Sequence, residues 1–315
     1  MRYVLITPAQ NEERFIEETV TSVIRQTVKP VRYVVVDDGS SDRTTELVGD
    51  VIAGHPWITL VRLPPRAVRD FAGKVQAFNA GMAHLQDVAF DVIGNLDADV
   101  SLEPDHCEYL LTQFTADQKL GVAGTIYTQP GGFDSMLDSF EGEECVAGPL
   151  QLFRRECFEQ IGGYVPNSLG GIDWIAVTTA RMKGWRTCAF TGRRFHHHRL
   201  MGTATSSALG AMFAYGRKDY VLGGSPLWQI GRVCYRMTKQ PFIVGGLALG
   251  AGYTWAAATR TQRAVSHELL QFHRHEQRKK LRNILRTLLT RGRLDKFRGG
   301  KSGSETTSTP RAHVS

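Results

Sequence analysis

The sequence predicts an α/β protein with a doubly wound, mostly parallel sheet and a helical appendage at its carboxyl end. Apolar runs over 34–36 and 92–96 are typical of strands buried on both faces, which lie at the centre of parallel sheets. Strand-like and helix-like patterns alternate over the first hundred residues, as in βαβ units. Acidic residues follow both apolar runs, at the sheet edge where open α/β folds bind ligands.

The elements expected in this part of the chain each have a local cause. Pro8 fixes φ and is expected to end the first strand. Asp42 is expected to cap the second helix, because a short acceptor satisfies free amide groups at a helix start. The expected elements are strand 3–6, helix 15–24, strand 33–36, helix 44–48, strand 58–62, helix 74–85 and strand 92–96.

The charge of the chain is unevenly distributed. The 315 residues carry a net charge of +7, and hydrophobic residues make up 42% of the chain, as in ordinary folded proteins. Residues 260–301 contain 13 Lys/Arg and 3 Asp/Glu, so the basic character belongs to the tail. We therefore expect three regions: a domain over 1–200, a helical, apolar and basic membrane-associated region over 201–298, and a disordered tail over 299–315.

The cysteines and the amino terminus favour a reducing compartment. The five cysteines are odd in number and form no C-x-x-C pair, which favours small buried apolar side chains over a disulfide framework or a zinc site. The chain enters a strand almost at once and shows no cleavable signal pattern. We expect the protein to work on the cytoplasmic side.

Several short motifs appear in a fixed order. They are Thr7-Pro8-Ala9-Gln10-Asn11-Glu12, the run from Val35 to Thr44 that contains Asp37-Asp38-Gly39-Ser40, the G-K-x-x-A-x-N-x-G run from Gly73 to Gly81, Asp97-Ala98-Asp99, and the stretch 148–163. Together they resemble the inverting family 2 glycosyltransferases of the GT-A fold, in particular bacterial exopolysaccharide and cell-envelope enzymes. The resemblance covers about 200 residues, and four matching segments beside the D-x-D motif are more specific than that motif alone.

The resemblance implies a nucleotide-diphosphate sugar as donor and Mg²⁺ or Mn²⁺ as cofactor, since these cations prefer carboxylates together with phosphate oxygens. Asp99 would bind the metal, and Asp97 would face the ribose or a metal-bound water. Taken alone, the two carboxylates would be better explained by a solvated turn after a strand. The remaining donor-site residues implied are Pro8, Ala9 and Glu12 around the nucleoside, Asp38 at the base, and Lys74 at the base or phosphates.

The resemblance also implies a general base for the acceptor hydroxyl. Asp173, in Gly170-Gly171-Ile172-Asp173-Trp174, matches the position of that carboxylate, although Ile172 stands where the family more often has a first acid. The alternative is that Asp173 only caps the helix that follows.

Three successive histidines, His196, His197 and His198, offer a further metal ligand. In an extended segment they alternate sides, so at most two face one way. His198 is the first choice and His197 the second, while Arg199 is expected to contact the diphosphate. The alternative is a surface cluster with incidental metal affinity.

The carboxyl-terminal region combines an uncharged stretch, 241–258, with a basic amphipathic pattern over 268–289. Both are explained by attachment of 241–298 to an anionic membrane surface, either monotopic or through a single span. A helical lid on the core and a nucleic-acid-binding arm are the alternatives. Nucleic acid is disfavoured, because such arms rarely carry an apolar segment.

These observations predict a metal-dependent, inverting, non-processive glycosyltransferase acting on a glycan or lipid-linked acceptor at the cytoplasmic face of the membrane. Non-processivity is what the resemblance implies, because the sequence lacks the Q-x-x-R-W motif that resembling polysaccharide synthases carry. The alternatives are an inactive GT-A module that scaffolds a membrane glycan-assembly complex, and a nucleotidyltransferase, which would need a G-x-G-T-R-like loop that the sequence lacks.

Overall fold

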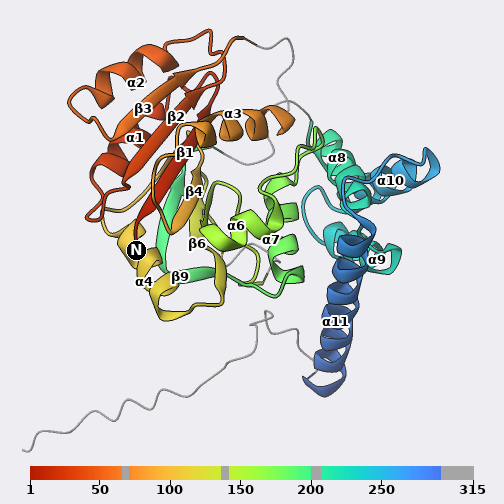
Figure 1. Cartoon of the computed structure of the whole chain (residues 1–315). Coiled ribbons are helices and arrows are strands. Elements are labelled where there is room, and N and C mark those ends of the chain that lie inside the picture. The colour runs from red at the N-terminus through yellow and green to blue at the C-terminus, as the bar shows by residue number, and fades with distance from the viewer. Residues whose placement is uncertain (66–70, 136–141, 200–206, 292–315) are drawn as a thin grey trace, which may run out of the picture.

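The computed structural model describes residues 1–65, 71–135, 142–199 and 207–291 (Figure 1). In this part of the chain a layered α/β unit is followed by helices that lie on the side of the sheet away from α1 (Ile16–Ile24) and α2 (Thr44–Ile52) (Figure 1). The tail 299–315, expected to be disordered, is outside the described residues.

The described strands form one nine-stranded sheet in the order β3-β2-β1-β4-β8-β6-β9-β5, with β7 paired to β6. The first four strands in this order are parallel, whereas β8 runs antiparallel to both of its neighbours. The strand bounds are β1 Tyr3–Ala9, β2 Arg32–Asp37, β3 Ile58–Arg62, β4 Val92–Leu96, β5 Val100–Ser101, β6 Leu120–Gln129, β7 Phe133–Asp134, β8 Leu150–Arg154 and β9 Arg186–His197.

The expectation of a mostly parallel sheet is therefore wrong beyond β4. The sheet is mixed, with β6 and β9 parallel but β5 and β7 antiparallel to their partners. Regular β-α alternation stops after β4, where β5 follows directly without a helix between the two strands.

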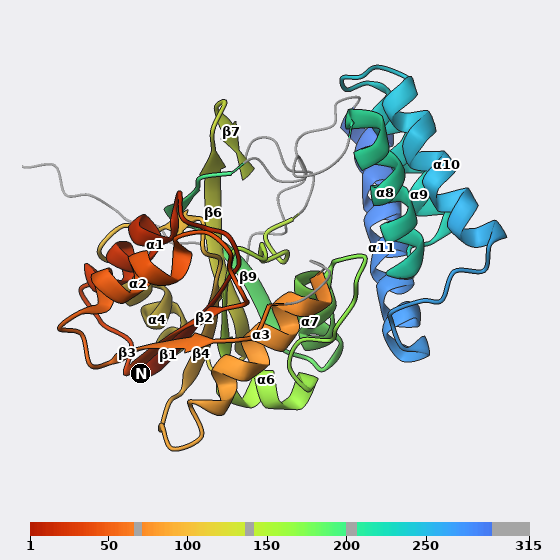
Figure 2. The ribbon, with the colours of Figure 1, turned by 90° about the horizontal axis from the view of Figure 1, so that it is seen from above.

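Helices cover both faces of the sheet (Figure 2). Alternate residues of each central strand point to opposite faces: Leu5 and Val35 enter the core with α1 and α4, while Ile6 and Val36 enter the core with α3, α6 and α7. The remaining helix bounds are α3 Phe71–Ala83, α4 His106–Ala116, α6 Arg155–Ile161, α7 Ile172–Met182, α8 Ala208–Val221, α9 Pro226–Met237, α10 Val244–Ala258 and α11 His267–Arg291.

The first strand is longer than predicted. It runs to Ala9, and Pro8 pairs in register with Val36 rather than ending the strand. Pairing of β1 with β4 stops at Ile6, so a residue without an N–H interrupts no ladder on that side. Asp42 does bind a free amide group at the start of α2, since its Oδ1 accepts a hydrogen bond from the Thr44 N–H at 3.0 Å. The cap position itself is Arg43, one residue further along the chain.

The helices after residue 207 pack closely on one another. A Cβ at Gly216 of α8 would lie 2.0 Å from the Leu249 carbonyl oxygen, and a Cβ at Gly252 of α10 would lie 2.0 Å from the Phe213 carbonyl oxygen. Glycines in the uncharged stretch thus allow close helix packing. The helix formed there, α10, has 15 residues, and across the described residues none of the helices reaches the length and apolarity needed to cross a membrane. The single-span alternative is corrected accordingly.

Candidate active site

The turns after β1 and β2 are linked by hydrogen bonds. Asn11, which has a φ of 56°, accepts the Ser41 N–H on its Oδ1 at 2.8 Å and donates its own N–H to Ser40 Oγ at 2.9 Å. The N–H of Glu12 donates to Thr44 Oγ1 at 2.8 Å. These contacts fix the predicted nucleoside-binding turns against each other at the carboxyl ends of two adjacent parallel strands.

The two adjacent aspartates of the first acidic cluster have different surroundings. Asp37 holds the turn, since its Oδ1 accepts the Ser40 N–H at 2.9 Å and its Oδ2 accepts the hydroxyl of Thr45. Asp38 is buried beside the end of β1, where its N–H donates to the Ala9 carbonyl at 2.8 Å. Asp38, Pro8 and Ala9 therefore share one edge of the sheet, as predicted.

The second acidic cluster follows β4 at the same edge. The Lys74 ammonium of α3 contacts Asp97 Oδ1, which also accepts the Asn95 Nδ2–H at 3.1 Å. Asn95 donates from the same nitrogen to the Gly148 carbonyl at 3.0 Å. Its Oδ1 is buried and has no hydrogen-bond partner among the described residues. Lys74 and Asp97, both predicted donor-site residues, are thus directly paired.

Asp99 lies deeper in the same edge, between charged neighbours. Its Oδ1 is 3.4 Å from His197 Nε2, and its Oδ2 is 3.7 Å from Arg199 Nε. Burial, together with the negative charge of Asp97, raises the pKa of Asp99, while His197 and Arg199 partly oppose this rise. Arg199 also makes a two-pronged ion pair with Glu12, with Nη1 to Oε1 at 3.0 Å.

His198 does not lie beside Asp99. Its ring stacks on Phe15 with 5.4 Å between centroids, and its Nε2 is 3.0 Å from Ser101 Oγ and 3.4 Å from Glu18. The histidines alternate sides, as predicted. The one that lies at the acidic edge is His197, the second choice, whereas His198, the first choice, points toward α1.

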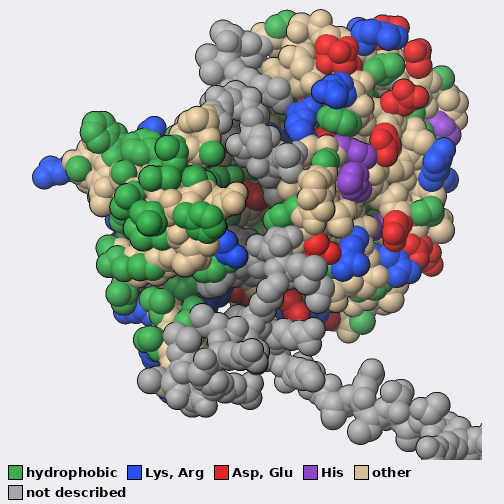
Figure 3. Space-filling view, turned by 180° about the vertical axis from the view of Figure 1, so that it is seen from behind, with side chains coloured by type: hydrophobic (Ala, Val, Ile, Leu, Met, Phe, Trp, Pro, Cys, Tyr) green, Lys and Arg blue, Asp and Glu red, His purple; other side chains and the backbone are tan. Residues whose placement is uncertain are grey.

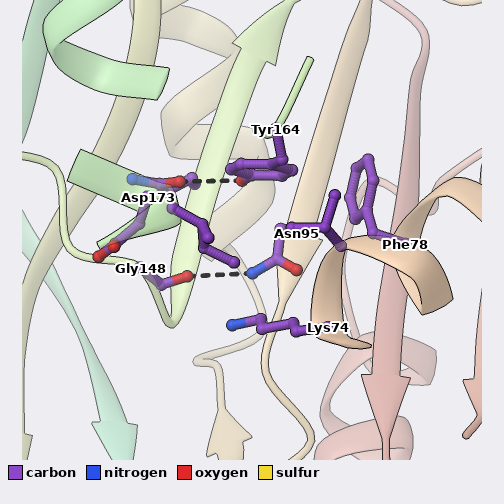
Figure 4. Close-up of a pocket in the computed structure, with 9 residues that line it drawn as sticks. Lys74, Phe78, Asn95, Gly148, Tyr164 and Asp173 are labelled. Carbon is purple, nitrogen blue, oxygen red and sulfur yellow. Dashed lines mark hydrogen bonds between the residues drawn. The ribbon is translucent and has the colours of Figure 1, made fainter. Parts of the chain in front are cut away.

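Asp173 lines a pocket with Lys74 and Asn95 (Figure 4). It is the second residue of α7, after Gly170 and Gly171, which have φ values of 82° and 81°. The helix cap position is Gly171, so Asp173 lies within the first turn and is not the cap residue. Its carboxylate packs against Gly148, where a Cβ would lie 2.6 Å from Asp173 Oδ2. The space measures about 10 Å³, room for roughly one water molecule.

A divalent cation fits this edge on the chemistry of its donors. Asp99 and Asp97 place two carboxylates close enough for one to raise the other's pKa, a repulsion that a cation would offset. Within the described ranges, no group of three or more His, Cys, Asp or Glu side chains could hold a metal ion. Mg²⁺ bound with a nucleotide needs only one or two carboxylates, because phosphate oxygens supply further ligands.

Three residues of the pocket were not predicted from the sequence: Asn95, Gln151 and Tyr164 (Figure 4). The Tyr164 O–H donates a hydrogen bond to Gln151 Oε1 at 2.9 Å. Asn95 is a polar residue inside the apolar run 92–96, and that interruption is a usable signal. Gln151 lies in β8, whose antiparallel pairing with β4 brings it opposite Asn95.

Comparison with known proteins identifies the class. A model of the family described as "Glycosyl transferase family 2" matches residues 4–162, half of the chain. The matched residues include both acidic clusters and the strands that carry them. The chain belongs to glycosyl transferase family 2, and it is a glycosyltransferase, as its motifs predicted.

Curated relatives include the chondroitin synthase of Pasteurella multocida, 29% identical over 118 residues, which are 38% of this chain and 11% of that protein. The poly-beta-1,6-N-acetyl-D-glucosamine synthase of Staphylococcus aureus is 29% identical over 111 residues, which are 35% of this chain and 25% of that protein. The chain therefore matches at most a quarter of the length of these two relatives.

Solved structures support the GT-A fold. The mannosyltransferase PcManGT from Pyrobaculum calidifontis, in complex with GDP-Man and Mn²⁺, aligns with a TM-score of 0.53 at 18% identity, over 92% of this chain and 81% of that chain. Residues 1–349 of S. aureus TarS, in complex with UDP-GlcNAc, align with a TM-score of 0.53 at 14% identity, over 81% of this chain and 72% of that chain.

Proposed function

We propose that this protein is a metal-dependent, inverting glycosyltransferase that moves a sugar from a nucleotide-diphosphate donor to a hydroxyl of a glycan acceptor. The observation that carries the proposal is the convergence of Asp97 and Asp99, Lys74 and Asp173 on one edge of the sheet. The donor half of this site comes from α3 and the carboxyl ends of β1, β2 and β4, and the acceptor half comes from α7.

The cationic side chains of the site are poised for a diphosphate. Lys74 is paired with Asp97 and Arg199 with Glu12, so each cation already faces the donor edge. A bound diphosphate would compete with these carboxylates for the same hydrogen-bond donors. The nucleoside would lie over Pro8, Ala9 and Asp38, where the linked turns hold the backbone in place.

Asp99 would hold Mg²⁺ or Mn²⁺, and His197 rather than His198 is the imidazole in reach of the same position. When bound, the metal would act as a Lewis acid and stabilise the charge that grows on the leaving diphosphate. The PcManGT and TarS complexes hold nucleotide sugars, and PcManGT also holds Mn²⁺, which supports the same donor class for this chain.

Asp173 would accept the proton of the attacking hydroxyl. It lies in the first turn of α7 and lines the pocket that also contains Lys74 and Asn95. The two left-handed glycines before it set the direction in which α7 starts. Inversion follows from a single displacement in which the hydroxyl attacks the face opposite the leaving diphosphate.

The acceptor is proposed to be a glycan, because both relatives named above are polysaccharide synthases. We extend this to a lipid-linked acceptor, non-processive transfer and a location at the cytoplasmic membrane face, with attachment through 241–298. These finer points rest on the apolar and basic composition of that region and on the missing Q-x-x-R-W motif.

Thermal shift with a panel of nucleotide sugars tests the proposal. At a ligand concentration about a hundredfold above Kd, binding stabilises a protein by about 2.7 kcal/mol, which is readily measured. At least one donor is expected to raise Tm with Mn²⁺ and to do so much less with EDTA. Asp99→Asn should lose the Mn²⁺-dependent part. No shift with any nucleotide sugar would contradict the proposal.

A further inference from the structure

Helix α9 turns an apolar stripe to solvent. Leu227 and Ile230 are 64% and 61% exposed, and Tyr235, two turns further on, is 42% exposed. These positions follow the i, i+3, i+8 spacing of one helix face. The opposite face is used for packing, where Gln229 is buried. The exposed side chains are thus not needed for the fold of this region.

Helix α10 and the segment before it continue the apolar surface. Phe242 and Ile243 are 59% and 61% exposed, and Leu247 and Trp255 of α10 are 54% and 58% exposed. Leu249 and Tyr253, on the other side of α10, are buried against α8. Figure 3 shows hydrophobic side chains gathered over this end of the molecule, in contrast to the mixed charges of the other half.

The same region carries only one sign of charge. Residues 220–267 contain five Lys/Arg and no Asp/Glu. Lys239 follows α9 and Arg260 follows α10, and both are exposed. Arg232 is paired with Asp219 of α8, so the exposed Lys239 and Arg260 are the cations that border the apolar side chains. Apolar side chains bordered by exposed cations match the interface of an anionic bilayer, where acyl chains lie beneath negative headgroups.

We propose that the outward face of α9, α10 and the segment between them, hereafter the α9–α10 surface, is the part of the protein that inserts into the interface of an anionic lipid bilayer. This deepens the membrane location proposed above and does not depend on the transfer chemistry. Trp255 and Tyr235 suit this surface, since aromatic rings with a polar atom favour the boundary between acyl chains and water.

A second copy of the chain fits this surface less well. A symmetric contact would bring exposed cations such as Lys239 and Arg260 of each copy toward those of the other, and like charges brought together cost binding energy. Anionic headgroups neutralise the same cations. Charge therefore selects lipid over self-association.

The amphipathic helix that was expected to contact lipid is α11, and its first half packs against the rest of the protein. Leu269 and Leu270 of α11 are buried, and Glu276 binds Arg181 of α7 with Oε1 to Nε at 2.9 Å. The His273 ring lies 4.5 Å from that of Trp174, next to Asp173. Helix α11 thus connects the helical region to the helix that carries the proposed base.

Co-sedimentation with vesicles tests the proposal on the full chain. The probes are phosphatidylcholine vesicles with and without about 30 mol % phosphatidylglycerol. We expect at least about tenfold stronger binding to the anionic vesicles, weakening with added salt. Leu247→Glu and Leu227→Glu, on α10 and α9, should each reduce this binding by about tenfold or more. Val31→Glu is the matched control: Val31 is 39% exposed on the other half of the molecule, and its variant should bind as wild type.

Three results would overturn the proposal: wild-type protein that ignores both kinds of vesicle, α9–α10 variants that bind like wild type, or a wild-type dimer that Leu247→Glu dissociates. Donor hydrolysis measured without vesicles separates this outcome from the proposed function. A protein that hydrolyses its donor but ignores lipid would defeat only the α9–α10 surface, and one that binds lipid but no donor would defeat only the proposed chemistry.

Discussion

The Nε2 atom of His197 lies 3.4 Å from Oδ1 of Asp99, while the ring of His198 stacks on Phe15. The register of β5 with β9 explains this: Val100, next to Asp99, pairs with His197, and Ser101 pairs with His196. The imidazole at the acidic edge is thus selected by strand pairing.

We predict that His197→Ala raises the Mn²⁺ concentration for half-maximal activity by about tenfold or more, because a ligand or close neighbour of the metal is lost. His198→Ala is the matched control on the next residue and should stay within about twofold of wild type. A Mn²⁺ titration of donor hydrolysis measures both. If His198→Ala raised the required Mn²⁺ concentration and His197→Ala did not, the assignment of His197 to the metal position would be wrong.

Asp173→Asn should bind the donor normally and lose transfer by about 10² or more, because an amide cannot accept the hydroxyl proton. Glu156→Gln, which changes an acid in the first turn of α6, should transfer at the wild-type rate. Isothermal titration gives donor affinity, and product formation gives the rate. Near-normal turnover of Asp173→Asn would refute its assignment as the base.

Removing the ion pair between α7 and α11 should destabilise the protein. Arg181 and Glu276 expose 13% and 24% of their side chains, so Glu276→Gln leaves a largely buried cation without its partner. We expect a loss of about 2 kcal/mol, reduced from the fully buried case by the partial exposure. In the matched control, Glu159→Gln removes the exposed Arg155–Glu159 pair, and the expected loss is below about 0.5 kcal/mol. Urea unfolding measures both, and equal losses would contradict the predicted difference.

Two histidines, the buried His106 and the half-buried His273, should make stability depend on pH. Burial lowers the pKa of His106 to about 4 and that of His273 to about 3, in the second case with help from the cations Arg181 and Lys280. Below the unfolded pKa of about 6.5 the unfolded chain binds more protons than the folded one, so stability falls as the pH drops from about 6.5 toward 4 and 3.

His273 is expected to change the free energy of unfolding by about 1.4 kcal/mol per pH unit in this range. That value is its contribution to the slope of stability against pH. Unfolding of His273→Phe at pH values from about 7 to 4 should show a slope reduced by that amount. His275→Gln, an exposed histidine on the same helix, is the control. An unchanged slope in His273→Phe would show that His273 titrates alike in both states.

Strands 58–62 and 92–96 form with the predicted bounds. In 92–96 the residues are buried on both faces, so the run itself indicates a strand without knowledge of its neighbours. The antiparallel β8 was missed, since pairing direction depends on contacts distant in sequence. Pro8 was misjudged for the same reason: it stays in a strand because β4 has already ended its pairing with β1.

The common location of Asp38, Asp97 and Asp99 at one edge of the sheet was predictable, because each of them follows a strand of buried residues. The choice between His197 and His198 was not, since alternation fixes which residues share a side but not which side faces Asp99. Asn95 was missed because its role lies in linking Asp97 to Gly148, a contact made across two strands.

The most direct test of the account is the release of nucleoside diphosphate from nucleotide sugars by wild-type protein and Asp99→Asn, each with Mn²⁺ and with EDTA. The account predicts that wild-type protein releases the diphosphate from at least one donor with Mn²⁺. Release should fall by about 10² or more with EDTA and in Asp99→Asn. Equal release with EDTA, or unimpaired release by Asp99→Asn, would contradict it.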